Sequence, residues 1–316
     1  MPAGMRDFPS CFGENGVQVA DSFSSTTLGS SSRGSKAGKN TVTCIYQTHL
    51  AGGACTVAIT WSKSLLGQGF SIAVDDMSDG KSLCKFDIKP WLFSKRKGSK
   101  TIDILHHHRH HTTKVDIFWN LASAKFGYGP EPSEGFYVAI TTNLHMVLLI
   151  GDMKMEAYRK TNLTLPPPTS SFAKLISKRE HISGKKMYST ISTRTQFCND
   201  GRIHDVTINC ESIGPKNVNP QFEIHIDRKS VMQVKNLSWK FRGNQTIHVD
   251  GNPVEVFWDV HSWLFGSPMS CSAVFMFQTC STSEKMSSWS CSEVFWKAQS
   301  AGLGFSLVLY AWRSNE

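Results

Sequence analysis

Two stretches of the chain share one alternation of apolar and polar residues and divide the chain into halves. Residues 254–266 read VEVFWDVHSWLFG, and residues 114–127 read KVDIFWNLASAKFG. Alternation that includes β-branched residues is typical of a half-buried strand. Because side chains on a strand repeat every two residues, Trp119 and Trp258 fall on the apolar faces of their strands. We therefore expect two central strands, each ending in a Phe-Trp pair and a turn.

Shorter alternating segments surround each central strand in the same order. They lie between residues 41 and 151 in the first half and between 187 and 316 in the second. Repetition of motifs in a fixed order indicates an internal duplication. Short strands separated by turns are typical of a β-sandwich. The sequence thus predicts an all-β fold of two similar sandwich-like halves, which either are separate or share one extended core.

Three segments interrupt this pattern. Residues 152–186 are expected to connect the halves, with short helices at 153–160 and 172–178. The three prolines between those helices fit neither a helix interior nor a central strand. Residues 1–40, rich in Ser, Gly and Thr, predict a flexible arm, and the Ser-rich stretch near 280–300 predicts a disordered loop.

Composition narrows the class of protein. Of the 316 residues, 40% are hydrophobic and 19% are charged, which favours a folded body over general disorder. No apolar run approaches the roughly 20 residues that span a bilayer, and the N-terminus lacks a secretory pattern. The nine cysteines are then expected to be reduced, with Cys84 and Cys210 as small core residues. We expect an intracellular, cytoplasmic protein that is neither secreted nor membrane-spanning.

The net charge of +9 indicates weak affinity for anionic partners. The densest basic run comprises Lys95, Arg96, Lys97 and Lys100, beside the apolar residues 91–93. Four cations at an anionic membrane contribute roughly 4 kcal/mol, or about millimolar affinity, which is too weak alone. We interpret the run as a solvated basic turn with a weak membrane contact as its alternative role.

The aromatic residues beside the basic turns are expected to be core residues. Trp91 and Trp239 occupy parallel places in the two halves, which predicts burial of both. Binding of single-stranded nucleic acid requires exposed aromatics that stack on bases. Nucleic acid is therefore not the expected partner.

Two groups of residues suggest chemistry. The histidines within 106–111 would bind a divalent metal, but neighbours on a loop supply no fixed tetrahedral geometry, so we interpret them as a polar hairpin loop. Asp259 and His261 lie two residues apart and would share a face of a continuing strand, as a carboxylate and a base require. The first half has Asn120 and Ala122 there, and no nucleophile motif accompanies the pair.

We interpret Asp259 as the acceptor of a structural hydrogen bond at the end of its strand. Asp259 and His261 nevertheless remain, with the basic run, a candidate interaction surface. The Gly-x-Gly pairs at 67–69 and 127–129 lack the helix that a phosphate site needs, so no nucleotide site is expected. We expect no catalytic residues, metal or cofactor.

Several segments carry a specific family resemblance, which covers nearly the whole chain. They are WSKSLLGQG (61–69), KPWLF (89–93), FWNLASAK (118–125), GPEPSEGFY (129–137), REH (179–181), WKFRGNQ (239–245) and WDVHSW (258–263). In these segments the chain resembles the plant proteins grouped as DUF868. The departures are the His-rich loop, Asn120 where Asp is common, and the insertion near 280–300. The resemblance implies a plant intracellular protein and brings no mechanism or cofactor.

These observations lead to one functional hypothesis and its alternatives. We expect a non-enzymatic binding or adaptor protein with an unidentified protein partner, because the strands form a duplicated scaffold without a coherent catalytic set. The alternative is a peripheral phospholipid-binding β-sandwich module. A hydrolase or sugar-binding enzyme that uses Asp259 and His261 is the third hypothesis, since fold alone does not give function.

Overall fold

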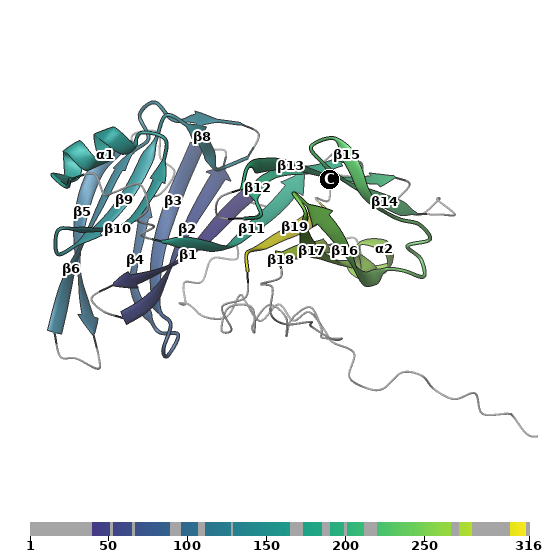
Figure 1. Ribbon diagram of the computed structural model, residues 1–316, viewed down its shortest axis with the longest axis horizontal. Coiled ribbons are helices and arrows are strands. Elements are labelled where there is room, and N and C mark those ends of the chain that lie inside the picture. Colours follow the sequence, from purple (N-terminus) through teal and green to yellow (C-terminus); the bar gives the residue numbers. More distant parts are fainter. Residues whose placement is uncertain are drawn as a thin grey trace, which may run out of the picture. The chain divides into compact units, whose positions relative to one another are not determined.

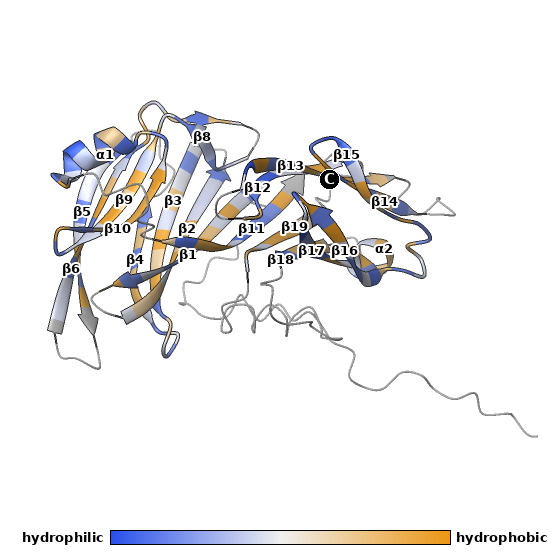
Figure 2. Cartoon of the chain, in the orientation of Figure 1, coloured by the Kyte–Doolittle hydropathy of each residue, from blue (hydrophilic) through white to orange (hydrophobic). Residues whose placement is uncertain are grey.

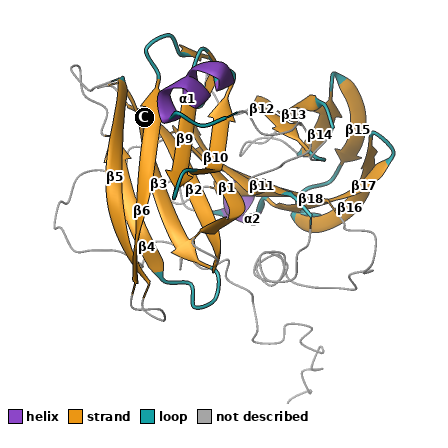
Figure 3. Cartoon of the chain, turned by 60° about the vertical axis from the view of Figure 1, so that its left-hand side comes forward, coloured by secondary structure: helices purple, strands orange, loops and turns teal. Residues whose placement is uncertain are grey.

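The computed structural model describes most of the chain, and its elements are almost all strands (Figures 1 and 3), which confirms the all-β prediction. The predicted arm, the prolines at 166–168 and the predicted loop near 280–300 lie outside the described residues. The described residues are 40–50, 53–64, 67–88, 96–106, 111–127, 129–164, 173–184, 190–198, 201–211, 220–266, 272–279 and 304–313.

The largest sheet contains strands from both halves of the chain. All neighbouring strands in it are antiparallel except β19 and β11, which run parallel. Its nine strands, in spatial order, are β16 (Arg242–Val249), β17 (Asn252–Asp259), β18 (Ser272–Thr279), β19 (Ser306–Arg313), β11 (Lys174–Gly184), β1 (Asn40–Leu50), β2 (Gly53–Ser64), β3 (Gly67–Asp76) and β4 (Ser82–Ile88).

Each half adds a four-stranded antiparallel sheet of its own. The first half contributes β10 (His145–Gly151), β9 (Tyr137–Thr142), β6 (His111–Asn120) and β5 (Lys97–His106). The second contributes β12 (Thr190–Gln196), β13 (Ile203–Glu211), β14 (Gln221–Ile226) and β15 (Lys229–Val234). A short pair, β7 (Lys125–Phe126) and β8 (Pro132–Glu134), completes the described strands. The predicted central strands are β6 and β17.

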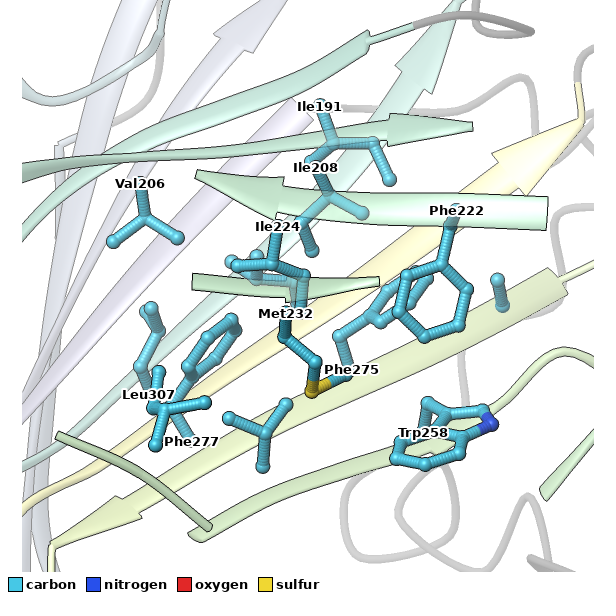
Figure 4. Close-up of a cluster of buried hydrophobic side chains, with 14 of the residues drawn as sticks. Ile191, Val206, Ile208, Phe222, Ile224, Met232, Trp258, Phe275, Phe277 and Leu307 are labelled. Atoms are coloured by element: carbon cyan, nitrogen blue, oxygen red, sulfur yellow. The ribbon is translucent and has the colours of Figure 1, made fainter. Parts of the chain in front are cut away.

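The alternating residues face two separate hydrophobic cores. In the second half, Phe222 packs edge-on against both Trp258 and Phe275 (Figure 4). In the first half, Phe70 packs edge-on against Trp119 and at a tilt of 42° against Trp61. Figure 2 shows the matching alternation of hydrophobic and hydrophilic positions along the strands. Leu175 of β11 packs against both cores. The halves therefore share one sheet but bury distinct clusters.

The prediction of two short helices in the segment that connects the halves is partly wrong. Helix α1 (Lys154–Thr161) forms as predicted, and its Ala157 and Tyr158 pack on Tyr137 of β9. The helix expected at 172–178 is wrong, because residues 174–178 begin strand β11 instead. This strand pairs with β1 on one side and β19 on the other, and pairing on both sides outweighs the weak helix propensity of a short segment.

Candidate functional site

Asp259 and His261 do not share a face of one strand, so that prediction is wrong. Strand β17 ends at Asp259, and helix α2 (His261–Phe265) begins two residues later. One carboxylate oxygen of Asp259 accepts the backbone N–H of His261 at 3.0 Å. The other accepts the Nε–H of Arg242 at 2.8 Å. Asp259 thus fixes the chain direction at the strand end, as the structural interpretation of the sequence anticipated.

The His261 side chain belongs to an aromatic cluster at this end of the second half. Its ring centroid lies 5.1 Å from that of Phe241 and 5.3 Å from that of Phe265. The Arg242 guanidinium carbon lies 5.7 Å from the centre of the Phe241 ring, within the range of a cation–π contact. Phe265 remains 54% exposed. The cluster is therefore a partly exposed aromatic surface beside a cation.

Trp239 was expected in the core but is 88% exposed, so that prediction is wrong. The residue that enters the core from this loop is Leu237, which is fully buried. Asn236, with a left-handed φ of 60°, tightens the turn, and its C=O accepts the N–H groups of Trp239 and Lys240. The turn thus directs the indole to solvent and leaves only the leucine to fill the core.

The backbone of this loop is fixed at both sides. The indole N–H of Trp258 donates to the Lys240 C=O at 2.9 Å, and the Val260 N–H donates to the Phe241 C=O at 2.9 Å. An exposed tryptophan on a well-bonded loop is presented without a large ordering cost on binding. We use the name Trp239 surface for Lys235, Trp239, Lys240, Phe241, Arg242, His261 and Phe265.

The charge of the Trp239 surface is positive. Lys235 and Lys240 are exposed, and neither forms an ion pair with another described residue. Arg242 pairs with Asp259, and both groups remain partly accessible. Sequence reasoning missed this surface because it assigned Trp239 to the core. The signal that identifies it is the interleaving of aromatic and basic residues, WKFR, directly after a turn.

The basic run of the first half does not form one patch. Lys97 and Lys100 lie on opposite faces of β5, because their positions differ by an odd number. Lys97 Nζ lies 2.7 Å from Glu156 Oε1 of α1, and Lys100 Nζ lies 5.3 Å from the centre of the Phe86 ring. Arg96 is exposed just before β5, and Lys95 lies outside the described residues, as does Trp91.

The corresponding end of the first half repeats the backbone pattern without the aromatic cluster. The Leu121 N–H donates to the Arg96 C=O at 2.7 Å, as Val260 does to Phe241. The Ala122 N–H donates to the side chain of Asn120 at 3.0 Å, as His261 does to Asp259. Arg96 and Ala122 therefore stand where the second half has Phe241 and His261, so the cluster is specific to the second half.

A second polar cluster lies at the opposite ends of the same strands. The buried His204 has Nδ1 2.8 Å from Asp227 and Nε2 3.0 Å from Asp250, and Arg202 lies 3.1 Å from Asp250. Asp227 belongs to the β14–β15 turn and Asp250 to the β16–β17 turn. Because these hairpins come from different sheets, the cluster clamps the sandwich. Both Asp residues have a left-handed φ, and in the sequence the Asp250-Gly251 pair is a typical hairpin signal.

A third polar cluster joins the halves. Lys178 of β11 is 7% exposed, and its Nζ lies 2.8 Å from Glu131 and 3.1 Å from Glu180. The same Nζ donates to the Arg194 C=O of β12 at 2.9 Å. All three donors of the ammonium are thus satisfied, and the cluster is a structural pin rather than a free reactive amine.

The core thiols among the described residues offer little nucleophilic chemistry. Burial raises the pKa of Cys210 to about 12 and that of Cys84 to about 11. Cys210 is buried as predicted, whereas Cys84 is half-buried against the first core. A thiol with a raised pKa carries almost no thiolate at neutral pH. No group of three or more metal-ligating side chains occurs among the described residues, which exclude His107–His110 of the His-rich loop.

Comparison with known proteins gives one match. No helix in the described parts of the chain has the length and apolarity to cross a bilayer. No curated protein and no solved structure matches the chain. The model of a plant protein family of unknown function, DUF868, matches residues 37–313. This match extends over all described strands, from β1 to β19. The chain therefore belongs to the DUF868 family of plant proteins.

Proposed function

We propose that this protein is a non-enzymatic binding protein, an adaptor that contacts a protein partner through the Trp239 surface. The observation that carries the proposal is the 88% exposure of Trp239 on a loop whose backbone is hydrogen-bonded on both sides. A folded chain gains nothing in stability from an indole held in water. Tryptophan and arginine are the residue types that most often dominate the binding energy of protein interfaces.

The absence of an assembled reaction centre at this surface supports a binding role. Asp259 uses both carboxylate oxygens for the His261 amide and the Arg242 guanidinium. It therefore does not orient the imidazole of His261 as an acid–base pair requires. The His261 ring instead packs between Phe241 and Phe265.

A phospholipid-binding role is the second candidate, favoured by the cations beside Trp239 and Phe265. Tryptophan suits the interface of a bilayer, and each cation near an anionic leaflet contributes about 1 kcal/mol. Lys235, Lys240 and Arg242 together contribute about 3 kcal/mol, which alone corresponds to weaker than millimolar affinity. In the first half, Lys97 is paired with Glu156 and adds little. The protein partner is therefore the better-supported proposal.

We further propose that the two halves arose by duplication. Each half has two four-stranded antiparallel runs, β1–β4 with β5, β6, β9 and β10, and β12–β15 with β16–β19. Gly98 pairs with Trp119 in β5–β6 as Gly243 pairs with Trp258 in β16–β17. The buried free thiols of Cys44, Cys55 and Cys210 support a reducing, intracellular location.

Proximity labelling in plant cells tests the proposed function, with the labelling enzyme fused to the full chain. We expect Trp239→Ala to remove a reproducible set of soluble neighbours from the labelled proteins. The matched control is Leu144→Ala, because Leu144 is 82% exposed in the β9–β10 turn, away from this loop. The control should keep the neighbours.

Two results would contradict the adaptor role. If the intact protein and Trp239→Ala label the same neighbours, the Trp239 surface does not bind the partner. Catalytic turnover of a small molecule that His261→Ala abolishes, with the fold intact by circular dichroism, would replace the adaptor by an enzyme.

A further inference from the structure

We propose that the partner segment is extended and acidic, and that it adds to the free edge of β16 as an extra strand while its acidic end reaches the Trp239 surface. This inference rests on the proposed binding function, because it names the partner of the same surface. Strand addition to an exposed sheet edge is a common mode of peptide recognition, in which main-chain hydrogen bonds supply affinity and side-chain pockets supply specificity.

Strand β16 is one edge of the nine-stranded sheet, with β17 as its only strand neighbour in the described part of the chain. The bond from the Val260 N–H to the Phe241 C=O sets which residues face β17. Backbone groups of an antiparallel strand alternate between the partner and the open side. The groups that point to the open side therefore belong to Arg242, Asn244, Thr246 and His248.

In the described part of the chain, this edge has neither the bulge nor the proline that often blocks strand addition. Its register with β17 is continuous from Arg242 to Val249, and the strand contains no proline. Bulges, prolines and inward charges are the common protections of an edge. By contrast, the pairing of β4 at the other end of the sheet is interrupted between Val74 and Asp75.

The Trp239 surface distinguishes β16 from the other regular edge strands. Arg242 begins β16 and directly follows Trp239, Lys240 and Phe241, so a segment along the edge runs onto the exposed indole. The equivalent edge, β5, begins with Lys97, whose charge is already neutralised by Glu156. Strand β16 is therefore the edge that lies next to both an exposed anchor, Trp239, and lysines without an ion-pair partner among the described residues.

Charge decides the class of partner. Lys235 and Lys240 have no described ion-pair partner, and Arg242 shares its charge with Asp259. Glu255 accepts bonds from the neutral side chains of Asn244 and Thr246 and places a negative charge farther along the edge. The positive end of the edge is thus the Trp239 end. Asp and Glu in the partner are expected to lie there, because complementary charge orients and selects a segment.

Selection from a display library of short random peptides on the full-length protein tests the partner class. We expect enriched peptides to combine alternating apolar residues with a cluster of Asp or Glu, and to lose at least about tenfold in affinity for Trp239→Ala. Enriched peptides that are neutral or basic would overturn the inference. A selection that enriches no peptides would also overturn it.

A proline substitution in the edge strand distinguishes strand addition from binding through side-chain contacts alone. His248→Pro removes one open-side N–H and leaves the ladder with β17 intact, and we expect it to weaken the selected peptides several-fold. The matched control is Asp103→Pro, the equivalent open-side position of β5, which should leave affinity unchanged. Equal affinity for the intact protein and His248→Pro would overturn the strand addition.

A third outcome distinguishes this inference from the proposed function. Sedimentation with vesicles of phosphatidylserine and phosphatidylcholine, lost in Trp239→Ala and at high salt, would replace the peptide by a membrane. If peptides and vesicles both fail to bind, while Trp239→Ala still removes neighbours in cells, the adaptor function stands and only the acidic segment is rejected.

Discussion

Gly243 lies directly opposite Trp258, and the indole occupies the space that a side chain at position 243 would need. A Cβ on Gly243 would lie 2.5 Å from the Cζ2 atom of Trp258. The first half repeats the relationship, with 2.7 Å between a Cβ on Gly98 and Cζ2 of Trp119. Both tryptophans are large buried residues that line their cores. A glycine usually weakens the strand that contains it. Here the absence of a side chain leaves the space in which the indole packs.

Substitution of this glycine should destabilise the fold. Gly243→Ala forces the buried Trp258 to move, and overpacking of this kind costs about 1–3 kcal/mol in the free energy of unfolding. Urea unfolding followed by tryptophan fluorescence measures the loss. Gly127→Ala is the control, because a Cβ at that position meets no atom within 4 Å. Equal midpoints for the two variants would contradict the packing argument.

Removal of the buried ammonium at the junction should be more costly. Burial lowers the pKa of Lys178, but the attraction of Glu131 and Glu180 raises the pKa by more than burial lowers it. The group therefore stays charged. Lys178→Met leaves two carboxylates without their cation, and we expect a loss of about 3–5 kcal/mol. Lys125→Met breaks an exposed ion pair with Glu134 and should cost less than about 1 kcal/mol.

Thermal unfolding of these two lysine variants, compared with the intact protein, checks the difference. A Lys178→Met protein that unfolds at the same temperature as Lys125→Met would show that the pin carries little stability. It would also show that the two carboxylates find other partners or bind protons.

Substitutions of Asp259 test whether this residue has a structural role at the end of β17. Asn120 holds the same position in the first half and accepts the same kind of backbone bond. Asp259→Asn should therefore preserve the bond to the His261 N–H and change stability by a few tenths of a kcal/mol. Asp259→Ala removes the acceptor and should cost about 0.5–2 kcal/mol, comparable to the loss of a side-chain acceptor at a helix N-terminus.

Chemical denaturation of both Asp259 variants measures this ratio. If Asn and Ala are equally destabilising, the lost interaction is the charged one with Arg242 rather than the backbone bond. That result would shift the role of Asp259 from the turn to the ion pair.

Acid should open the clamp at the far end of the second half. The Asp205 amide, and then the His204 side chain, hold the pKa of Asp227 below its usual value. The contribution of Asp227 is therefore present above the pKa of the unfolded chain, about 3.9, and is lost as the pH falls through the folded value. Asp227→Asn should unfold at a lower temperature than the intact protein at neutral pH.

The same variant should show a smaller further decrease in Tm below about pH 4. Calorimetry at several pH values gives both quantities. Asp205→Asn is the control, because its side chain forms only an exposed pair with Arg194 among the described residues. Parallel pH profiles for the intact protein and Asp227→Asn would exclude Asp227 as the titrating group.

The sequence was sufficient to predict those strands that have one buried face and one more exposed face. Val254, Val256 and Trp258 are buried and alternate with half-buried residues, so the period of two is visible in the letters. Strand β11 gave no such signal. Its buried residues include Lys178 and Glu180, whose burial depends on Glu131 and Thr193 from distant elements.

The candidate surface depended on one turn that the repeat concealed. Matching Trp239 to Trp91 placed it in the core, whereas the three-dimensional match pairs Phe241 with Arg96 through the same backbone bond. Alignment of motifs by residue type thus misplaced the loop by several residues. The left-handed Asn236 decides which residue points inward, and a single sequence does not reveal that conformation.

The parallel pairing of β11 with β19 affects how the chain is made. A ribosome releases β11 long before it releases β19, and until then one side of β11 has no strand to pair with. Such a row of open amides and carbonyls readily recruits other chains. We therefore expect a product terminated before Ser306 to aggregate through the unpaired edge of β11 rather than to form an intact first half. Because the two halves share one sheet, we expect them to complete folding together despite their separate cores.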